Sequence, residues 1–398
     1  MGKKLRCLAG MLGLMVLALL AGCLKNNSGT TNNGTGTLYV ASQGDSLVSG
    51  FSIALSSGEL SSFGSGIATG DTPTAMILSP DGSTIFLLNS GGGSNNGCGS
   101  VGASCITAYT INSDGTLKAV SGTTSAGTSP RSLAMDGAGK FLFVANPGPP
   151  NIANSGTILV FSISGTTLTP VAQPNPPVFG NQPVAVAVTP DGKFLYVANQ
   201  TDGTVSGFSV DSAGVLTNLL NSANTISYGV GVAPSGLAVT ADGNILYAAN
   251  SGSNNVSAFA ICDNATPSCP TPDGTLTQAP GSPFSAGLGP VAIIEDPSHT
   301  FLYVADEQSN QVSQYKISPG TGALTALSPA AVSTGVSPVS LAAITGPTAS
   351  TVTTDYLYVT NLGGTSISVF SYDTTVGTLT VDGAPVVTGG QPSAVVVK

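Results

Sequence analysis

A short unit recurs seven times along this chain and constrains the fold more than any other feature. Its clearest copy is the stretch 189–199, TPDGKFLYVAN. The Asp-Gly pair predicts a tight hairpin turn, and the apolar run after it, rich in aromatic and β-branched residues, predicts a strand buried on both faces. The aromatic position of this strand recurs at intervals of 47 to 57 residues, at Tyr39, Phe86, Phe143, Tyr196, Tyr247, Tyr303 and Tyr358.

Each period also contains the signals of three further strands. A Pro-led apolar strand precedes the turn, as at 183–188, and an alternating strand follows the buried one, as at 205–210. A Gly-Thr-Leu turn, as at 115–117, then opens a more polar fourth strand. A period of about 50 residues is too long for a β-helix rung and is typical of a propeller blade. We therefore predict an all-β fold, a seven-bladed β-propeller of four-stranded antiparallel blades over 37–398.

The two ends of the repeat region complement each other. No Pro-led strand precedes Leu38 in the first copy, whereas 389–398, GGQPSAVVVK, provides such a strand after the last copy. We expect this C-terminal strand to pair with the N-terminal blade, which closes the ring and removes both exposed sheet edges.

The first 22 residues have the pattern of a lipoprotein signal peptide. Three basic residues precede an apolar stretch from Leu8 to Leu20, which is too short to span a bilayer as a helix. The following LAGC sequence resembles the bacterial lipobox, so we expect cleavage before Cys23 and a lipid on its sulfur. The alternative is an ordinary signal peptide cut nearby.

The residues after the predicted cleavage site indicate an anchored protein that stands off the membrane. The stretch 23–36 is rich in Gly, Asn, Ser and Thr and predicts a flexible tether. Leu24 stands where an inner-membrane retention signal would resemble Asp, which favours the outer membrane. We expect an exported protein, lipid-anchored to the cell envelope at the outer membrane or cell surface, with the periplasmic side as a further alternative.

The charge of the chain excludes some partners. Its formal net charge is −9, and loss of three basic residues with the leader makes it −12. Only Arg131 remains as an arginine beyond the leader. Phosphate backbones are bound by clustered Lys and Arg, so we expect no nucleic-acid partner. Trp is absent, which argues against a quinone-dependent dehydrogenase with Trp stacking platforms.

Four of the six cysteines form two local pairs. Cys7 lies in the leader and Cys23 is the predicted lipid site. The remaining residues fall in Gly-, Asn- and Ser-rich insertions, and an exported chain favours disulfides over free thiols there. The predicted pairs are Cys98 with Cys105 and Cys262 with Cys269.

The repeat resembles a known family. The unit 183–199, PVAVAVTPDGKFLYVAN, is similar to the YVTN repeat of the lactonase-like seven-bladed propellers, which include 6-phosphogluconolactonase and muconate-lactonising enzymes. The resemblance covers 37–398 and implies a ring-opening or ring-closing step on a cyclic ester. Such chemistry needs a base that works near neutral pH and a cation for the carboxylate or oxyanion.

The residue after each leading Pro is expected to lie at one mouth of the central channel. These seven residues are Thr74, Arg131, Val184, Ser235, Val291, Val339 and Ser393. Arg131 is the one cation among them, and it is either an anchor for an anionic ligand or a structural arginine. Asp202, Asp306 and Glu307 are predicted on loops of the same face and complete the candidate ligand site.

Other polar residues are assigned to turns and loop ends. His299, the only histidine, aligns with Gly192 in the turn on the opposite face, so we predict a turn residue at positive φ. The Asp-Gly turns contain Asp81, Asp191 and Asp242. The recurring asparagines end the buried strands and are expected to satisfy loop backbone; they are Asn89, Asn146, Asn199, Asn250 and Asn361. We expect no metal site and no cofactor.

These observations favour a monomeric binding or interaction module over an enzyme, and no catalytic residue is assigned. The expected partners are a protein, a glycan or a small anionic ligand, with membrane contact through the lipid anchor alone. The alternative is a lactonase-like hydrolase, related to 6-phosphogluconolactonase, that acts on a sugar lactone or a similar cyclic ester.

Overall fold

The computed structural model describes residues 35–91, 98, 104–148, 156–175, 177–220, 225, 227–263, 269, 272–349 and 352–398. Every regular element in these ranges is a β-strand, and they hold no helix long and apolar enough to cross a membrane. The predicted leader, Cys23, Leu24 and nearly all of the tether lie outside the described residues.

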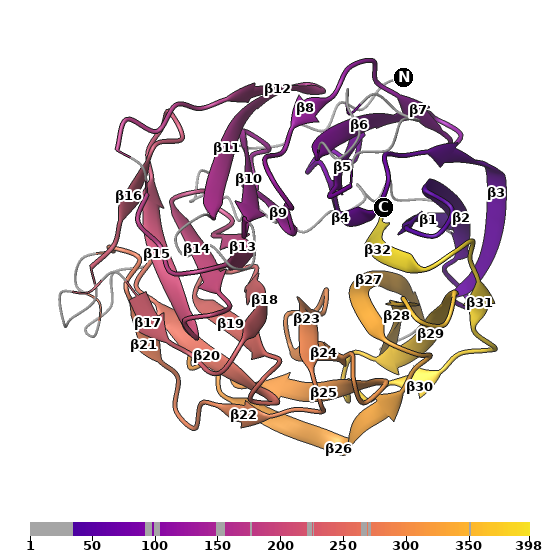
Figure 1. Cartoon of the computed structure of the whole chain (residues 1–398). Coiled ribbons are helices and arrows are strands. Elements are labelled where there is room, and N and C mark those ends of the chain that lie inside the picture. The colour runs from indigo at the N-terminus through magenta and orange to yellow at the C-terminus, as the bar shows by residue number, and fades with distance from the viewer. Residues whose placement is uncertain are drawn as a thin grey trace, which may run out of the picture.

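The strands form seven antiparallel sheets arranged as blades around one axis (Figure 1). Blade 1 contains β1 (Thr35–Ser42), β2 (Leu47–Ala54), β3 (Glu59–Ala68) and β32 (Pro392–Val397). Blade 2 contains β4 (Pro73–Leu78), β5 (Thr84–Asn89), β6 (Cys105–Ile111), β7 (Leu117–Ala119) and β8 (Thr124–Ser125). Blade 3 contains β9 (Ser132–Met135), β10 (Phe141–Asn146), β11 (Thr157–Ser164) and β12 (Thr167–Pro170).

The other four blades follow in chain order. Blade 4 contains β13 (Pro183–Val188), β14 (Phe194–Asn199), β15 (Thr204–Val210), β16 (Leu216–Asn218) and β17 (Ser227–Gly229). Blade 5 contains β18 (Pro234–Val239), β19 (Ile245–Asn250), β20 (Asn255–Ile261), β21 (Leu276–Gln278) and β22 (Phe284–Ser285). Blade 6 contains β23 (Pro290–Glu295), β24 (Phe301–Asp306), β25 (Gln311–Ile317) and β26 (Leu324–Ser333). Blade 7 contains β27 (Pro338–Ala349), β28 (Val352–Asn361), β29 (Ser366–Asp373), β30 (Thr380–Val381) and β31 (Val386–Val387).

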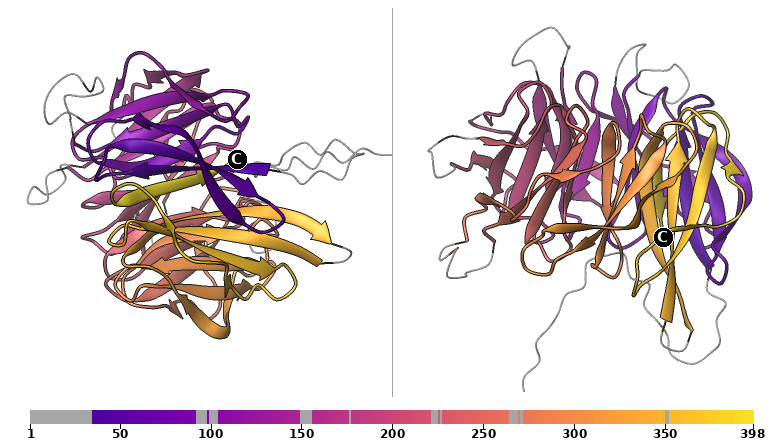
Figure 2. Two further views of the ribbon diagram at one scale, coloured as in Figure 1. Left: turned by 90° about the vertical axis from the view of Figure 1, so that its right-hand side faces the viewer. Right: turned by 90° about the horizontal axis from the view of Figure 1, so that it is seen from below.

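The predicted closure of the ring is confirmed. β32 pairs antiparallel with β1, with Leu38 opposite Val397 and Tyr39 opposite Val396. Figure 1 shows the yellow β32 as the innermost strand of the indigo first blade. The strands run between an upper face, with the loops that enter the inner strands, and a lower face, with the hairpin turns (Figure 2). Blade 1 therefore has an inner strand like the other six blades.

The hydrophobic core consists of seven clusters, one between each pair of neighbouring blades. The second strands of the two blades supply four or five buried residues of each cluster, and all six residues of β14 are buried. Between blades 4 and 5, for example, Tyr196 and Val205 pack with Leu246 and Phe259. Burying one such large apolar side chain contributes about 1.5–3 kcal/mol. Packing therefore joins each blade to both neighbours.

The repeated tyrosine joins neighbouring blades by a hydrogen bond. In five blades its hydroxyl donates to the carbonyl of a left-handed glycine in the next blade, at 2.6–3.0 Å. In blade 1, burial and then the nearby Asp114 carboxylate raise the pKa of Tyr39 to about 12, so its hydroxyl stays protonated and donates. The pairs are Tyr39–Gly115, Tyr196–Gly274, Tyr247–Gly322, Tyr303–Gly377 and Tyr358–Gly58. Blades 2 and 3 have Phe86 and Phe143 at this position.

The hairpin turns on the lower face behave as the sequence predicts. In blade 4, Asp191 Oδ1 accepts hydrogen bonds from Thr189 Oγ1 at 2.7 Å and from the Lys193 N–H at 3.1 Å. Gly192 follows with φ of 77°. A glycine suits this left-handed conformation because it has no Cβ to clash.

The outer edge of most blades differs from the predicted single fourth strand. In blades 2, 4, 5 and 7 that strand is divided into two short pieces, both paired with the third strand of the same sheet. In blade 4, β16 pairs with the C-terminal half of β15, and β17 pairs with its N-terminal half. Blade 3 has the first piece, β12, and no second piece among its described strands.

Candidate functional site

Arg131 lies on the upper face, at the entrance to the inner strand of blade 3. Its backbone N–H donates to the Ala145 carbonyl at 2.9 Å. The corresponding residue in the other six blades occupies a shift in register between the first and second strands. The Arg131 side chain is exposed and makes no ion pair or hydrogen bond with the described residues.

Asp202 lies on the upper face of blade 4 and is already bonded within its own loops. Its carboxylate accepts hydrogen bonds from the Asn181 N–H at 2.8 Å and from Asn181 Nδ2 at 2.9 Å. These bonds join the loop after β14 to the loop before β13. Asp202 is exposed, but its hydrogen bonds hold these two loops together.

Asp306 does not lie in a loop, as the sequence suggests, but is the last residue of β24 and is fully buried. Its Oδ2 accepts hydrogen bonds from Ser313 Oγ at 2.6 Å and from Gln311 Nε2 at 3.3 Å. Burial raises the pKa of Asp306 to about 6, against these hydrogen bonds, which favour the ionised form. A carboxylate without solvent contact does not present itself to a ligand.

Glu307 follows Asp306 and is half-buried, with its N–H donating to the Gly289 carbonyl at 2.8 Å. The four predicted site residues therefore belong to three different blades of the same face. Blade 3 carries Arg131, blade 4 carries Asp202, and blade 6 carries Asp306 and Glu307. No ion pair or hydrogen bond joins Arg131 to these acids among the described residues.

The recurring asparagines have a structural function. In blade 4, Asn199 Nδ2 donates to Ser206 Oγ at 3.0 Å, which connects the second and third strands. In blades 5 and 7 the same amide bonds Ser257 and Ser368. A glycine of the loop before the inner strand packs on the amide, and a Cβ added at Gly180 would lie 2.8 Å from Asn199 Cβ. The asparagines thus seat this loop close to the blade.

Both predicted disulfides are present. Cys98 bonds Cys105 at the start of β6, and Cys262 bonds Cys269 after β20, each with Cα atoms 5.5 Å apart. The first lies toward the upper face and the second toward the lower face. No group of three or more His, Cys, Asp or Glu residues able to hold a metal occurs in the described part of the chain.

His299 lies in the lower-face turn of blade 6, with φ of 58° as predicted. Its Nδ1 lies 3.2 Å from Oε2 of Glu295, the last residue of the inner strand β23. Sequence reasoning did not select Glu295. The available signal was a carboxylate at the inner-strand position where the preceding blades have Leu78, Met135, Val188 and Val239.

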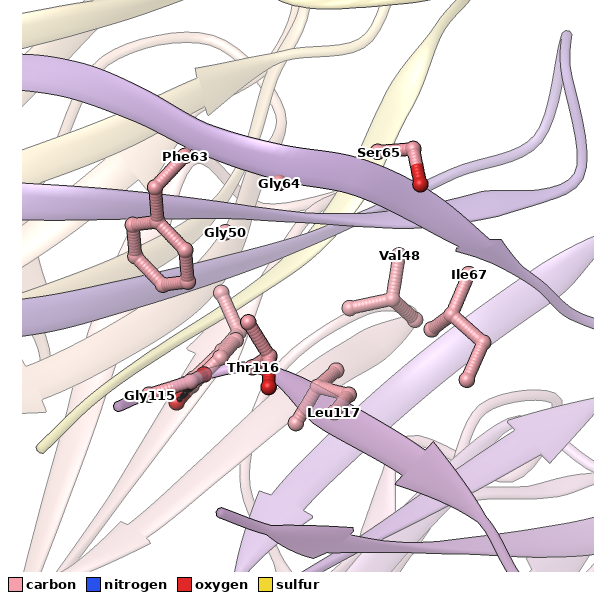
Figure 3. Close-up of a pocket in the computed structure, with 10 residues that line it drawn as sticks. Val48, Gly50, Phe63, Gly64, Ser65, Ile67, Gly115, Thr116 and Leu117 are labelled. Carbon is pink, nitrogen blue, oxygen red and sulfur yellow. Dashed lines mark hydrogen bonds between the residues drawn. The ribbon is translucent and has the colours of Figure 1, made fainter. Parts of the chain in front are cut away.

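Cavities lie between blades and at the outer edge of the ring among the described residues. The first, about 220 Å³, lies between blades 1 and 2 and is lined by Val48, Phe63, Ile67 and Leu117 among others (Figure 3). It is smaller than the ~300–1,000 Å³ of ordinary ligand pockets. The second, about 570 Å³, lies on the outer edge of blade 3, between β11 and the segment 177–179. Neither cavity is lined by an acidic, basic or histidine side chain.

The second cavity has a structural cause. The segment after β12 is held by the next blade, because Gln173 Nε2 donates to the Gly214 carbonyl at 3.1 Å and Gln173 Oε1 accepts from the Leu216 N–H at 2.9 Å. Gly214 occupies the turn that a blade 3 tyrosine would reach. Gln173 therefore takes over the bond that Phe143 cannot make, and the segment is drawn away from β11.

The fold defines a closed seven-bladed propeller, and the family follows from its sequence. The family model described as "Lactonase, 7-bladed beta-propeller" matches residues 92–169, 155–269 and 268–397. The chain belongs to this lactonase propeller family. No curated protein matches the chain in sequence.

Solved structures of similar propellers share the architecture across nearly the whole chain. A putative 6-phosphogluconolactonase from Bacteroides fragilis has 22% identity and a TM-score of 0.72, covering 93% of this chain and 100% of its own. The periplasmic gluconolactonase PpgL of Pseudomonas aeruginosa has 20% identity and a TM-score of 0.71, covering 92% and 99%. A putative 6-phosphogluconolactonase from Bacteroides uniformis has 17% identity and a TM-score of 0.69, covering 92% and 99%. At these identities the similarity shows the fold alone.

Proposed function

We propose that the protein hydrolyses a lactone, with a sugar lactone as the substrate class. The observation that carries this proposal is the match of the lactonase family model to residues 92–397. The fold shared with the periplasmic gluconolactonase of Pseudomonas aeruginosa supports the same choice. Lactone hydrolysis therefore replaces non-catalytic binding as the leading hypothesis for the function.

The proposed reaction sets chemical requirements on the site. Water adds to the lactone carbonyl, the ring C–O bond breaks, and the product is a hydroxy acid. A general base must accept a proton from the water, and a donor or cation must stabilise the oxyanion. Arg131, exposed on the upper face, is a candidate for the second requirement at that face.

The test is hydrolysis of a panel of lactones by purified Cys23→Ser protein. Glucono-δ-lactone, 6-phosphogluconolactone and γ-butyrolactone are followed by acid release at constant pH. We expect turnover of at least one sugar lactone well above the uncatalysed rate. Rates equal to the buffer blank with every lactone contradict the proposal.

A second candidate function is binding of an anionic ligand at the upper face without catalysis. It is favoured by one observation: Arg131 is an exposed cation with no acidic partner among the described residues, while Asp202 and Asp306 are engaged in other bonds. Calorimetry with gluconate and 6-phosphogluconate tests this function. We expect Arg131→Ala to weaken binding at least tenfold and the exposed control Lys118→Ala to leave it unchanged.

Export and lipid anchoring are further parts of the proposal. Two disulfides support an oxidising compartment. Cys23→Ser is expected to release the protein from membranes into the soluble fraction, because the predicted lipid site is lost. Continued membrane attachment of this variant contradicts the lipid anchor.

A further inference from the structure

The lower end of the inner strand in blade 6 differs from that of every other blade. The inner-strand residue opposite the position just before the recurring aromatic residue is apolar in six blades and is Glu295 in blade 6. The six apolar residues are Leu78, Met135, Val188, Val239, Ala343 and Val397. A carboxylate at an apolar position costs free energy, since its side chain is only 13% exposed.

The following turn of blade 6 breaks a second local rule. In blades 2 to 5 its left-handed position is a glycine, with φ between 65° and 77°. Blade 6 places His299 there with φ of 58°. A non-glycine residue in this conformation costs about 1 kcal/mol or more. Local rules that are broken without structural gain are most often broken for function.

These two exceptions meet in space. His299 Nδ1 lies 3.2 Å from Glu295 Oε2, and the same oxygen accepts a hydrogen bond from the Ala241 N–H of blade 5 at 2.8 Å. Glu295 is thus held from both blades. Burial raises the pKa of Glu295, against the Ala241 and His299 contacts.

One further carboxylate faces this pair from the turn of blade 5. Asp242 accepts hydrogen bonds from Thr240 Oγ1 at 2.6 Å and from the Asn244 N–H at 3.0 Å. Burial opposes its ionisation, but these bonds and the nearby His299 leave the pKa of Asp242 below its ordinary value. Asp242 therefore remains charged beside the pair.

We propose that Glu295 and His299 form an acid–base dyad on the lower face, with His299 as the catalytic base and Glu295 as its positioning residue. Glu295 accepts the Nδ1–H, which fixes the imidazole tautomer with a lone pair on Nε2. The His299 side chain is 39% exposed, so solvent reaches the imidazole.

The dyad offers a general base at the lower face, and this part of the inference rests on the proposed lactone hydrolysis. His299 Nε2 accepts a proton from water while the water oxygen bonds the lactone carbonyl carbon. The tetrahedral intermediate then expels the ring oxygen, which takes the proton back from Nε2. One water is consumed, one C–O bond breaks, and the hydroxy acid leaves with the imidazole neutral again.

The repeat itself provides the decisive variant. His299→Gly restores the residue that four other blades carry at this turn, so folding is not endangered, and we expect its melting temperature to stay the same or rise. Loss of a general base lowers rates by about 10²–10⁴-fold. We therefore expect His299→Gly to lower kcat on the lactone substrate at least a hundredfold.

Glu295→Gln tests the positioning function. We expect kcat to fall about tenfold or more with KM unchanged, because the substrate is still bound but the imidazole is no longer fixed. Lys118→Ala, at an exposed position of β7, serves as the control and is expected to retain kcat. Full activity of His299→Gly overturns the dyad, and so does an equal loss of activity in His299→Gly and Lys118→Ala.

A second substrate separates the dyad from the proposed function. Hydrolysis of p-nitrophenyl acetate, an activated ester, requires a base but no lactone recognition. If no lactone is turned over but p-nitrophenyl acetate hydrolysis falls at least tenfold in His299→Gly, the dyad stands and the lactone substrate class is wrong. Equal rates of wild type and His299→Gly on this ester as well contradict the dyad itself.

Discussion

Blades 3 and 4 are neighbours built from one repeat, yet they differ at the outer edge, at the repeated tyrosine and at the upper face. Blade 4 closes its outer edge with β17, and its Tyr196 hydroxyl bonds the next blade. Blade 3 has Phe143 at that position, no second outer piece among its described strands, and a cavity of about 570 Å³ beside β11. It also has the exposed Arg131.

The two blades agree where they pack against each other. β10 and β14 are each six residues long and fully buried, and their side chains share one cluster with Phe208 and Leu216. The comparison indicates that the ring is held together by the second strand of each blade, which packs against the two neighbouring blades. The outer edge and the upper face are free to vary. One change there accompanies another: Phe143 has no hydroxyl to bond the next blade, and Gln173 makes the hydrogen bond to Gly214 instead.

The largest expected effect tests the agreement between the blades. Leu142 and Leu195 occupy the same position of β10 and β14, and both are fully buried. We expect Leu142→Ala and Leu195→Ala each to lower the free energy of unfolding by about 2–5 kcal/mol, because each leaves a cavity between blades. Urea unfolding measures both. A blade 3 variant of near wild-type stability would show that blade 3 contributes little to the ring.

The next effect extends the comparison to blade 6, where Asp306 replaces the repeated asparagine. Its folded pKa of about 6 lies above the ordinary 3.8, so the stability it contributes is full at low pH and is lost as pH rises through 6. We expect Asp306→Asn to raise the free energy of unfolding at pH 8 by about 2 kcal/mol and to change it little at pH 4.

The matched control for this prediction is the reverse change in blade 4. Asn199→Asp places a buried carboxylate beside Ser206, and we expect it to introduce the same loss of stability between pH 4 and pH 8. Unfolding by urea at several pH values measures both variants. A pH-independent difference between Asp306→Asn and wild type would contradict the assigned cause.

A smaller effect tests the hydrogen bonds between blades. Tyr196→Phe removes the bond to the Gly274 carbonyl and is expected to cost about 1 kcal/mol. In blade 3 the bond from Gln173 to Gly214 makes the same connection, so Gln173→Ala is expected to cost a similar amount. Adding Phe143→Tyr to Gln173→Ala should recover part of that loss, whereas a double variant no more stable than Gln173→Ala would contradict the substitution of one bond for the other.

The smallest effect is local and concerns the outer edge. Ile158 of β11 and Val205 of β15 are equivalent, and strand alternation turns both N–H groups outward. Val205 lies opposite Tyr228 of β17, whereas Ile158 has no such strand beside it among the described residues. We expect about fivefold faster amide hydrogen exchange at Ile158, equivalent to one hydrogen bond of ~1 kcal/mol. Equal protection would show that the edge of blade 3 is covered.

The repeat period predicted the fold because each period carries turn, strand and loop signals that agree with one another. The closing strand, the left-handed glycines and both disulfides could be predicted from the sequence for the same reason. Asp306 was assigned to a loop although it aligns with the asparagines that end the second strand of other blades, and this alignment was the available signal. Glu295 was missed although it lies four residues before His299 in the same hairpin, at an inner-strand position that is apolar in the other blades. Only its hydrogen bond from Ala241 depends on the approach of blade 5, which no local pattern encodes.

The pairing of β32 with β1 also sets an order of events during synthesis. β1 emerges before the other strands, but its partner on the axis side, 392–397, is made after the six other blades. Until then blade 1 presents unpaired backbone groups that can join another chain. The nascent chain therefore cannot complete its blades one at a time in the order of translation. Blade 1, which is synthesised first, is among the last to become fully native.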